Sequence, residues 1–266
     1  MRRFFSVLLL AVSVSFNAQA TRFVYEVSMK TDSTAQPVVE NAFLDVSGSK
    51  SVFYGEKRSL RDSLMQRNRQ TRNFSFDRSQ MDQFRTQINY EIEKNIAEQQ
   101  IIYKNRIARD LYSYQEDRNF NWQILPETST IGTYKVQKAQ TDFAGRKWTA
   151  WFTQDVPVMD GPYKFSGLPG LIVKIEDAKG DYSFDLKETK AIANLPELQQ
   201  RGSVLAVKRK DYEKQLERFR KDPASMMQSM QRGGIRNSQR NPQADLDRKK
   251  RMEEEQRKNN NPIELS

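Results

Sequence analysis

The stretch that decides how this chain folds reads Asp160-Gly161-Pro162-Tyr163-Lys164-Phe165-Ser166-Gly167-Leu168-Pro169-Gly170-Leu171-Ile172. It holds three of the chain's eleven glycines and two of its nine prolines. Glycine permits positive φ, and proline fixes φ and removes a donor, so this density predicts a backbone held on one defined path. Strand-like segments lie on both sides, at 148–156 and 171–176. We therefore expect a shaped loop between two strands.

Outward from this loop, apolar and polar residues alternate with a period of two. Short strand candidates follow one another between residues 23 and 188 and are separated by tight-turn signals such as those at 47–49, 143–146 and 177–180. The spacing of strand–helix–strand units is missing, which favours antiparallel pairing. We predict a mainly β fold with a single curved antiparallel sheet, a half-barrel-like meander, followed by a C-terminal amphipathic helix. A closed barrel and a two-sheet sandwich remain open as alternatives.

The segments outside the strands define the domain organisation. Residues 1–20 have the features of an export signal, with a charged start, an apolar stretch and the cleavage pattern Ala18-Gln19-Ala20. The antiparallel β domain is expected over 21–207, with a mobile polar excursion, partly helical, at 56–83. Residues 208–232 are predicted to form an amphipathic helix, because apolar residues recur there at helical spacing. Residues 233–266 are almost devoid of apolar residues, which predicts a disordered basic tail.

The chain contains no Cys and no His, which excludes several kinds of chemistry. Ser-His-Asp and Cys-His triads cannot form, and neither can Cys/His zinc sites. Carboxylate chemistry, Ser-Lys nucleophiles and hard-cation binding by oxygen remain. The net charge of +10 lies mostly in the signal and the tail, where acidic residues interleave with the basic ones. We expect no nucleic-acid partner, no cofactor and no metal site.

Acidic residues gather around the Gly/Pro stretch and the hairpin that follows it. They are Asp155, Asp160, Glu176, Asp177, Asp181 and Asp185. A glycosidase would need two acids facing each other across a cleft, with the pKa of one raised by burial. Acids in turns usually accept hydrogen bonds from the local backbone instead. We therefore assign no catalytic residue.

Two groups of residues are candidates for ligand contact. The Gly/Pro stretch either builds turns that pack apolar residues into the core, or shapes one rigid lip of a cleft that grips a ligand or a peptide strand. On the second interpretation the binding residues are Gly161, Pro162, Lys164, Phe165, Gly167, Leu168, Pro169 and Gly170. Trp148 and Trp151 fall on opposite faces of one strand. One is expected in the core, and the other either lies under the C-terminal helix or is open to an apolar or sugar ligand.

Several short motifs occur in a fixed order along the chain. They lie at 131–139, 143–146, 150–153 and 161–165, and end in the hexapeptide Gly167-Leu168-Pro169-Gly170-Leu171-Ile172. Together they resemble the GLPGLI family of exported proteins, whose usual ending is similar to Asn261-Pro262-Ile263-Glu264-Leu265. Members of that family often carry Cys where this chain has Val136, so a thiol is not needed there. The resemblance implies an envelope protein of Gram-negative bacteria without an established activity, often linked with outer-membrane receptor systems.

Three functions fit these features. The first is a non-enzymatic binding or assembly factor, periplasmic or peripheral to the outer membrane, that acts on an envelope protein partner. The second is a carrier of a lipid or other apolar ligand, which predicts a sheet concavity lined by Ile, Leu, Val and Phe. The third is a carboxylate-only hydrolase, which predicts two acids that converge in a pocket. We expect the first, as an exported monomer with no transmembrane segment once the signal is removed.

Overall fold

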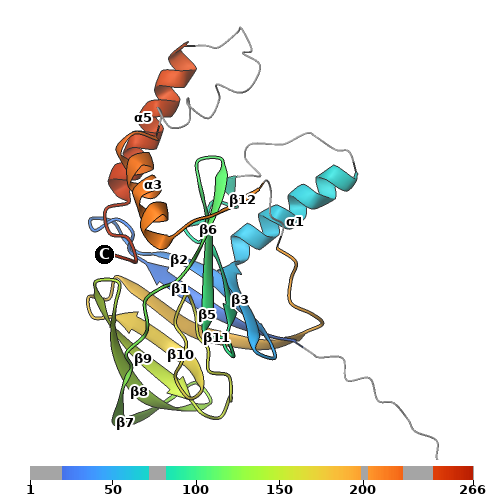
Figure 1. Cartoon of the computed structure of the whole chain (residues 1–266), viewed down its shortest axis with the longest axis vertical. Helices are drawn as coiled ribbons and strands as arrows, with labels where there is room; N and C mark the ends of the chain where they lie inside the picture. The colour runs from blue at the N-terminus through green and yellow to red at the C-terminus, as the bar shows by residue number, and fades with distance from the viewer. Residues whose placement is uncertain (1–19, 72–81, 199–202, 224–241, 266) are drawn as a thin grey trace, which may run out of the picture.

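Twelve strands pair into one open, curved sheet in the computed structural model, which describes residues 20–71, 82–198, 203–223 and 242–265 (Figure 1). The strand order across the sheet is β12-β6-β5-β4-β3-β2-β1-β11-β10-β9-β8-β7. All neighbouring strands are antiparallel except β12, which runs parallel to β6. The prediction of a mainly β fold with a single curved antiparallel sheet is confirmed, and the sheet does not close into a barrel.

The strands and helices have the following bounds. The strands are β1 Ala20–Met29, β2 Val38–Ser47, β3 Lys50–Gly55, β4 Glu91–Asn95, β5 Gln100–Ile107, β6 Asp110–Gln115, β7 Gln123–Ile131, β8 Tyr134–Phe143, β9 Arg146–Thr153, β10 Leu171–Asp177, β11 Tyr182–Ile192 and β12 Val204–Ala206. Among the described residues the helices are α1 Glu56–Gln70, α3 Arg209–Lys221 and α5 Pro242–Lys258.

The sheet consists of two meanders that share one seam. Strands β1 to β6 follow one another in space as in sequence, and so do β7 to β11. The seam is the pairing of β1 with β11, which runs from Ala20 opposite Ile192 to Met29 opposite Tyr182. Because consecutive antiparallel strands need only tight turns between them, the short turns of the sequence produce this order directly.

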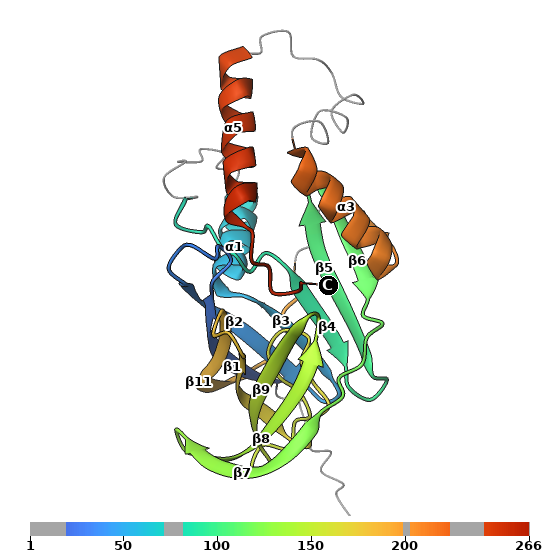
Figure 2. The ribbon, with the colours of Figure 1, turned by 90° about the vertical axis from the view of Figure 1, so that its left-hand side faces the viewer.

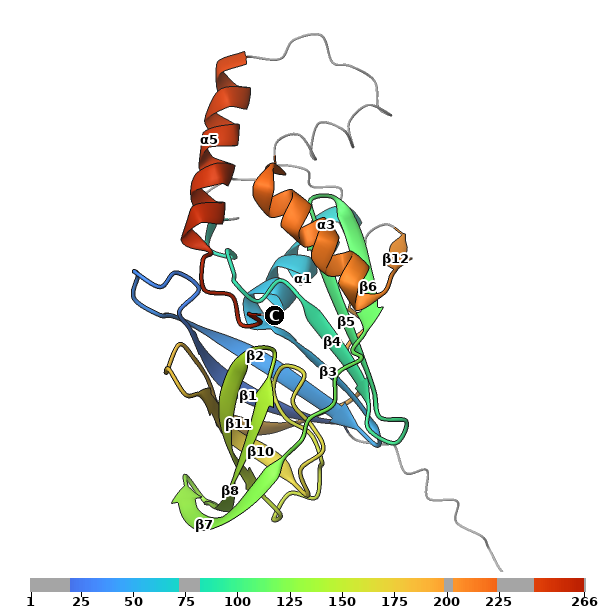
Figure 3. The same cartoon turned by 60° about the vertical axis from the view of Figure 1, so that its left-hand side comes forward.

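The hydrophobic core lies on the concave face of the sheet. On β1 the side chains of Phe23, Tyr25 and Val27 alternate into this core, as the period-two pattern requires. Figures 2 and 3 show the last described residues between the wing made by β3 to β6 and the wing made by β8 to β10. Helix α3 packs against β5 and β6, α1 packs against β2 and β3, and α5 projects away from the sheet.

The motif loop, residues 160–170, fills the centre of the concave face. Phe165 is fully buried, with its ring centroid 4.8 Å from that of Trp148 and 6.5 Å from that of Phe184. The loop is closed by backbone hydrogen bonds, including Gly167 N to Met159 O at 3.1 Å. Much of the space inside the curved sheet is therefore occupied by the chain itself.

The C-terminal region differs from the expected disordered tail over 233–266. Residues 242–258 form α5, and residues 259–265, here called the C-terminal peptide, lie against the sheet. The physical reason is that this peptide is held by side chains far away in sequence, such as Arg146, which composition does not reveal. Residues 233–241 and 266 lie outside the described residues.

The other predicted boundaries fall partly within the described residues. Helix α1 covers the first half of the predicted excursion at 56–83, and α3 lies within the predicted helix at 208–232; residues 72–81 and 224–232 lie outside the described residues. The predicted signal at 1–20 also lies outside them, apart from Ala20, which begins β1 and is buried. None of the described helices combines the length and the apolar character that crossing a membrane requires.

Candidate functional site

Lys164, at the centre of the motif loop, is fully buried together with its charge. Its Nζ donates hydrogen bonds to Glu116 at 2.6 Å, to Glu264 at 2.5 Å and to the hydroxyl of Tyr114 at 2.7 Å. A buried ammonium is tolerated only where such partners replace water. The motif loop, the end of β6 and the C-terminal peptide supply these groups, so the cluster joins three separate segments.

Aromatic rings surround the same ammonium. Its Nζ lies 4.8 Å from the ring centroid of Tyr103, 5.0 Å from that of Tyr114 and 5.5 Å from that of Tyr163. The negative face of an aromatic ring attracts a cation at such distances, and more strongly where water is excluded. The tyrosines therefore stabilise the charge of Lys164 in addition to its two carboxylates.

Arg118 is the second cation that contacts both carboxylates, and Arg209 lies 3.7 Å from Glu116. It donates to Glu116 at 2.7 and 2.9 Å and to Glu264 at 2.9 Å. Burial acts to raise the pKa of Glu116, but the hydrogen bonds and charges of Arg118 and Lys164 outweigh it and lower this pKa to about 2. At Glu264 burial also acts to raise the pKa, but Lys164 and Arg118 outweigh it, so the pKa of Glu264 is lowered as well. Both carboxylates are therefore ionised near neutral pH, and neither can act as a general acid there.

The cluster makes the stability of the protein sensitive to acid. Because the pKa of Glu116 falls from 4.5 to about 2 on folding, its contribution is complete above about pH 4.5 and is lost as the pH drops towards 2. We expect the melting temperature to fall between about pH 5 and pH 2. The Glu116→Gln variant should show a shallower fall across this window in calorimetry, because one of the responsible carboxylates is gone. Equal slopes in the two proteins would contradict this assignment.

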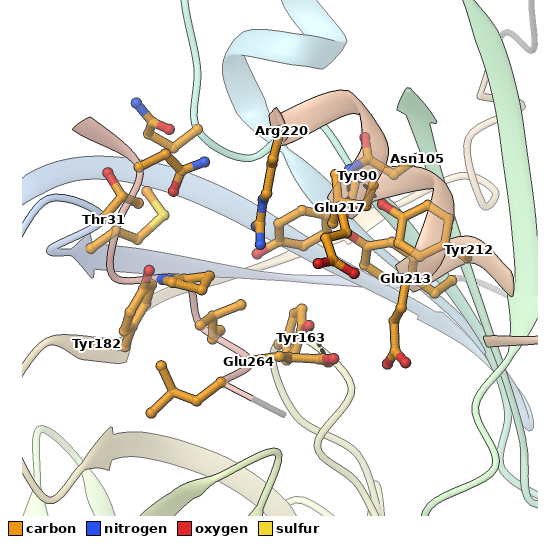
Figure 4. Close-up of a pocket in the computed structure, with 18 of the residues that line it drawn as sticks. Thr31, Tyr90, Asn105, Tyr163, Tyr182, Tyr212, Glu213, Glu217, Arg220 and Glu264 are labelled. Carbon is orange, nitrogen blue, oxygen red and sulfur yellow. Dashed lines mark hydrogen bonds between the residues drawn. The ribbon is translucent and has the colours of Figure 1, made fainter. Parts of the chain in front are cut away.

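A cavity of about 460 Å³ lies beside the cluster, between the concave face of the sheet, α3 and the C-terminal peptide (Figure 4). Six of the chain's ten tyrosines line it. They are Tyr90, Tyr103, Tyr114, Tyr163, Tyr182 and Tyr212. Leu216 and Phe219 of α3 and Ile263 of the C-terminal peptide add apolar surface. The lining therefore combines aromatic faces and hydroxyl groups with the charged side chains of Glu213, Glu217, Arg220 and Glu264 (Figure 4).

The tyrosines of the cavity are neutral hydrogen-bonding groups. Burial is the main cause that raises the pKa of each of the six above its usual value. Asn105 donates to the hydroxyls of both Tyr103 and Tyr212, at 3.3 Å each. Within the described part of the chain, the hydroxyl of Tyr90 has no hydrogen-bond partner, although Tyr90 is 92% buried. The hydroxyl is not among the buried polar atoms that lack a partner, so it is open to the cavity and offers a donor and an acceptor to a ligand.

The structure separates the residues that the sequence grouped as candidates. Six of the eight are buried in the motif loop, and two are exposed. The buried residues are Gly161, Pro162, Lys164, Phe165, Leu168 and Gly170, and the exposed ones are Gly167 and Pro169. None of the eight lines the cavity, to which the motif loop contributes Tyr163. Trp148 lies in the core, and Trp151 is half-buried on the opposite face beside Lys138.

Two of the acids considered in the sequence form buried ion pairs. Asp160 lies 2.5 Å from the Nζ of Lys94, and Asp177 accepts a hydrogen bond from Arg146 at 2.6 Å. Burial lowers the pKa of Lys94, whereas Asp160 raises it. These pairs fix the start of the motif loop and the turn before β9. Nowhere in the described residues do three or more acidic side chains gather in a way that could hold a metal ion.

Sequence reasoning missed the two acids that do converge. Glu116 follows β6 and Glu264 lies near the chain's end, and both are absent from the acids considered around the motif loop. The available signal was the similarity of residues 261–265 to the usual ending of the GLPGLI family, because a recurring ending within a polar tail indicates a fixed position for those residues.

This chain is similar to known proteins in two respects, a short sequence match and a similar fold. A family model described as "Protein of unknown function (Porph_ging)" matches residues 144–174, which comprise β9, the motif loop and the first part of β10. No curated protein matches this sequence.

The fold is similar to that of solved structures of PNGF-II. The structure in space group P21 aligns with a TM-score of 0.55 and 16% identity, and that in space group C2 with 0.55 and 17%. In both cases 76% of this chain is covered but only 34% of the other, so this chain spans about a third of the length of PNGF-II. At this identity the likeness concerns the fold alone.

Proposed function

We propose that this protein is an exported, non-catalytic binding protein of the cell envelope, and that the tyrosine-lined cavity is its ligand site. The observation that carries the proposal is the cavity itself, of about 460 Å³, with six tyrosines in its walls. Small-molecule sites have this size and are mostly apolar with a few placed polar groups. The fitting ligand has a flat apolar face and at least one group that hydrogen-bonds with a hydroxyl.

The chemistry of the charged cluster beside the cavity favours binding over catalysis. Lys164 is surrounded by partners and fully buried, so its amine is not available as a nucleophile. Glu116 and Glu264 do converge, as the hydrolase hypothesis requires, but both have lowered pKa values. A glycosidase needs one carboxyl group whose pKa is raised. The pair is therefore better suited to hold Lys164 than to transfer protons.

The carrier hypothesis is favoured less. It predicted a concavity lined by Ile, Leu, Val and Phe, whereas tyrosines dominate this cavity and the motif loop occupies much of the concave face. A ligand that is partly polar fits these walls better than a lipid chain.

Two features of the sequence support a place in the envelope. Residues 1–20 have the pattern of an export signal, and the motifs at 131–172 resemble the GLPGLI family of exported proteins. On this proposal the protein is periplasmic or peripheral to the outer membrane, and association with an outer-membrane receptor system is one setting in which it would work.

Native mass spectrometry tests the cavity as a ligand site. Protein purified gently from the envelope of its own host is expected to carry an additional discrete mass. The Leu216→Trp variant should lose this mass, because the half-buried Leu216 lines the cavity and an indole ring would fill it.

Lys214→Trp is the matched control, since it places the same bulky residue at an exposed position of the same helix. It should retain the bound mass. Wild-type protein without any bound molecule, or a Leu216→Trp variant that still carries it, would contradict the assignment.

A further inference from the structure

The C-terminal peptide lies in a groove between the two wings of the sheet and is bound through its backbone at both ends. Asn261 N donates to Thr31 O at 2.9 Å, and Leu265 N donates to Ala144 O at 2.9 Å. The side-chain nitrogen of Asn261 donates to Lys30 O at 2.7 Å. The turn after β1 and the turn before β9 thus hold the peptide from opposite sides.

Arg146 recognises the middle of the peptide. Its guanidinium donates to the side-chain oxygen of Asn261 at 2.6 Å, to Pro262 O at 2.8 Å and to Ile263 O at 3.0 Å. Asp177, at 2.6 Å, fixes the orientation of the guanidinium. Because these contacts follow the backbone, they require the peptide's path and one amide side chain, whereas the side chains at 262 and 263 need only be apolar.

Glu264 provides the charged anchor. Its carboxylate accepts hydrogen bonds from Arg118 at 2.9 Å, from Lys164 at 2.5 Å and from the Tyr163 hydroxyl at 2.6 Å. Charge-assisted hydrogen bonds of this kind are about twice as strong as neutral ones. The groove therefore recognises an acidic side chain three positions after an asparagine.

The helix that precedes the peptide contributes little to holding it. Helix α5 makes no extensive contact with any described strand or helix, and it projects away from the sheet (Figures 1 and 3). The peptide is thus bound by its own contacts, and the groove has the properties of a complete peptide-binding site.

We propose that this groove is a peptide-recognition site for the sequence Asn-apolar-apolar-Glu, which is occupied in cis by the chain's own C-terminal peptide. It accepts the same peptide from a second copy of the chain, because a second copy carries all of the recognised groups directly after α5, a helix that stands away from the sheet. The tether favours the cis arrangement, since it makes binding of the chain's own peptide an intramolecular event. If two copies exchanged their C-terminal peptides, the same contacts that form within one chain would link the two molecules.

The test uses the full chain with a protease site introduced within residues 233–241. Before cleavage, a fluorescent peptide with the sequence of residues 259–266 should not bind, because the tethered peptide occupies the groove. After cleavage, the C-terminal fragment should remain with the rest of the chain in gel filtration. The fluorescent peptide should then replace it, which anisotropy would report. The measured signal is the anisotropy of the peptide, so it does not depend on whether the cavity holds a ligand.

Glu264→Gln and Glu254→Gln in the cleaved fragment are matched variants. Glu264→Gln should weaken retention about tenfold or more, since it removes the charge from three hydrogen bonds. Glu254 is exposed on α5 and pairs only with Lys258, at 2.8 Å among the described contacts, so its variant should bind like wild type.

Three results would overturn the proposal. One is separation of the fragment while the remaining chain stays folded. Another is equal retention of the two glutamine variants. If the remaining chain unfolds after cleavage, added peptide should restore the folded form, as circular dichroism would show, and failure to do so is the third contradicting result.

Discussion

Lys164→Met is expected to lower the free energy of unfolding by about 3 to 5 kcal/mol, because it removes one partner from a buried ionic cluster. The methionine fills a similar volume, so the loss arises mainly from charge. Glu116 would remain buried and Glu264 half-buried beside it, with Arg118 as the cation that still contacts both. Denaturant unfolding at pH 7, with both the slope and the midpoint recorded, measures this loss.

A double-mutant cycle separates the charge effect from packing. Lys164→Met combined with Glu264→Gln should cost less than the sum of the two single variants, by about 1 to 3 kcal/mol, because the second change removes the carboxylate that the first leaves unpaired. Lys174→Met is the matched control: Lys174 pairs with Glu176 at 2.9 Å on a partly exposed part of β10, and its loss should cost no more than about 1 kcal/mol. If the two losses of unfolding free energy simply add, the charges of Lys164 and Glu264 are not energetically coupled.

Gly170→Ala is the second substitution with a large expected effect. A Cβ at this position would lie 2.0 Å from Thr153 O and 2.7 Å from Thr153 C, and the backbone has φ of +147°. Thr153 ends β9 and pairs with Leu171 of β10, so the clash can be relieved only by breaking this register. We expect a loss of about 3 to 5 kcal/mol, or failure to fold, from strain and overlap together.

Gly167→Ala measures the backbone strain separately from the atomic overlap that Gly170→Ala also causes. Gly167 has φ of +90°, yet nothing lies within 4 Å of a Cβ built there. Its substitution should therefore cost only the backbone strain, about 1 to 2 kcal/mol. Thermal unfolding of both variants side by side makes the comparison. Similar losses at the two glycines would mean that contact with Thr153 does not explain the requirement at Gly170.

The predictable part of the fold was local. Alternation on β1 and tight turns such as the one at 177–180 predicted antiparallel strands in sequence order, and the sheet has this order in each meander. The density of glycine and proline predicted a shaped loop at 160–172. These features depend on neighbouring residues and on the period of side-chain direction, which a single sequence contains.

The site itself depended on residues that are distant in sequence. Lys164 is separated from Glu116 by 48 positions and from Glu264 by 100. In the sequence each of these residues has the pattern of an ordinary solvated charge, and the region around Glu264 is polar enough to predict disorder. Nothing local distinguishes a lysine that will be buried from one that will remain in water.

The sequence by itself determined the antiparallel order of the consecutive strands between residues 23 and 188 and the defined path of the motif loop, since each follows from backbone preferences and alternation within a few residues; the parallel strand β12 was not among them. The tertiary structure alone decided that the C-terminal peptide is bound, that six tyrosines enclose a cavity and that Lys164 is buried. The physical reason is that a buried charge is stable only when several partners arrive together. That condition is met where the motif loop, the end of β6 and the C-terminal peptide come together between the two wings of the sheet.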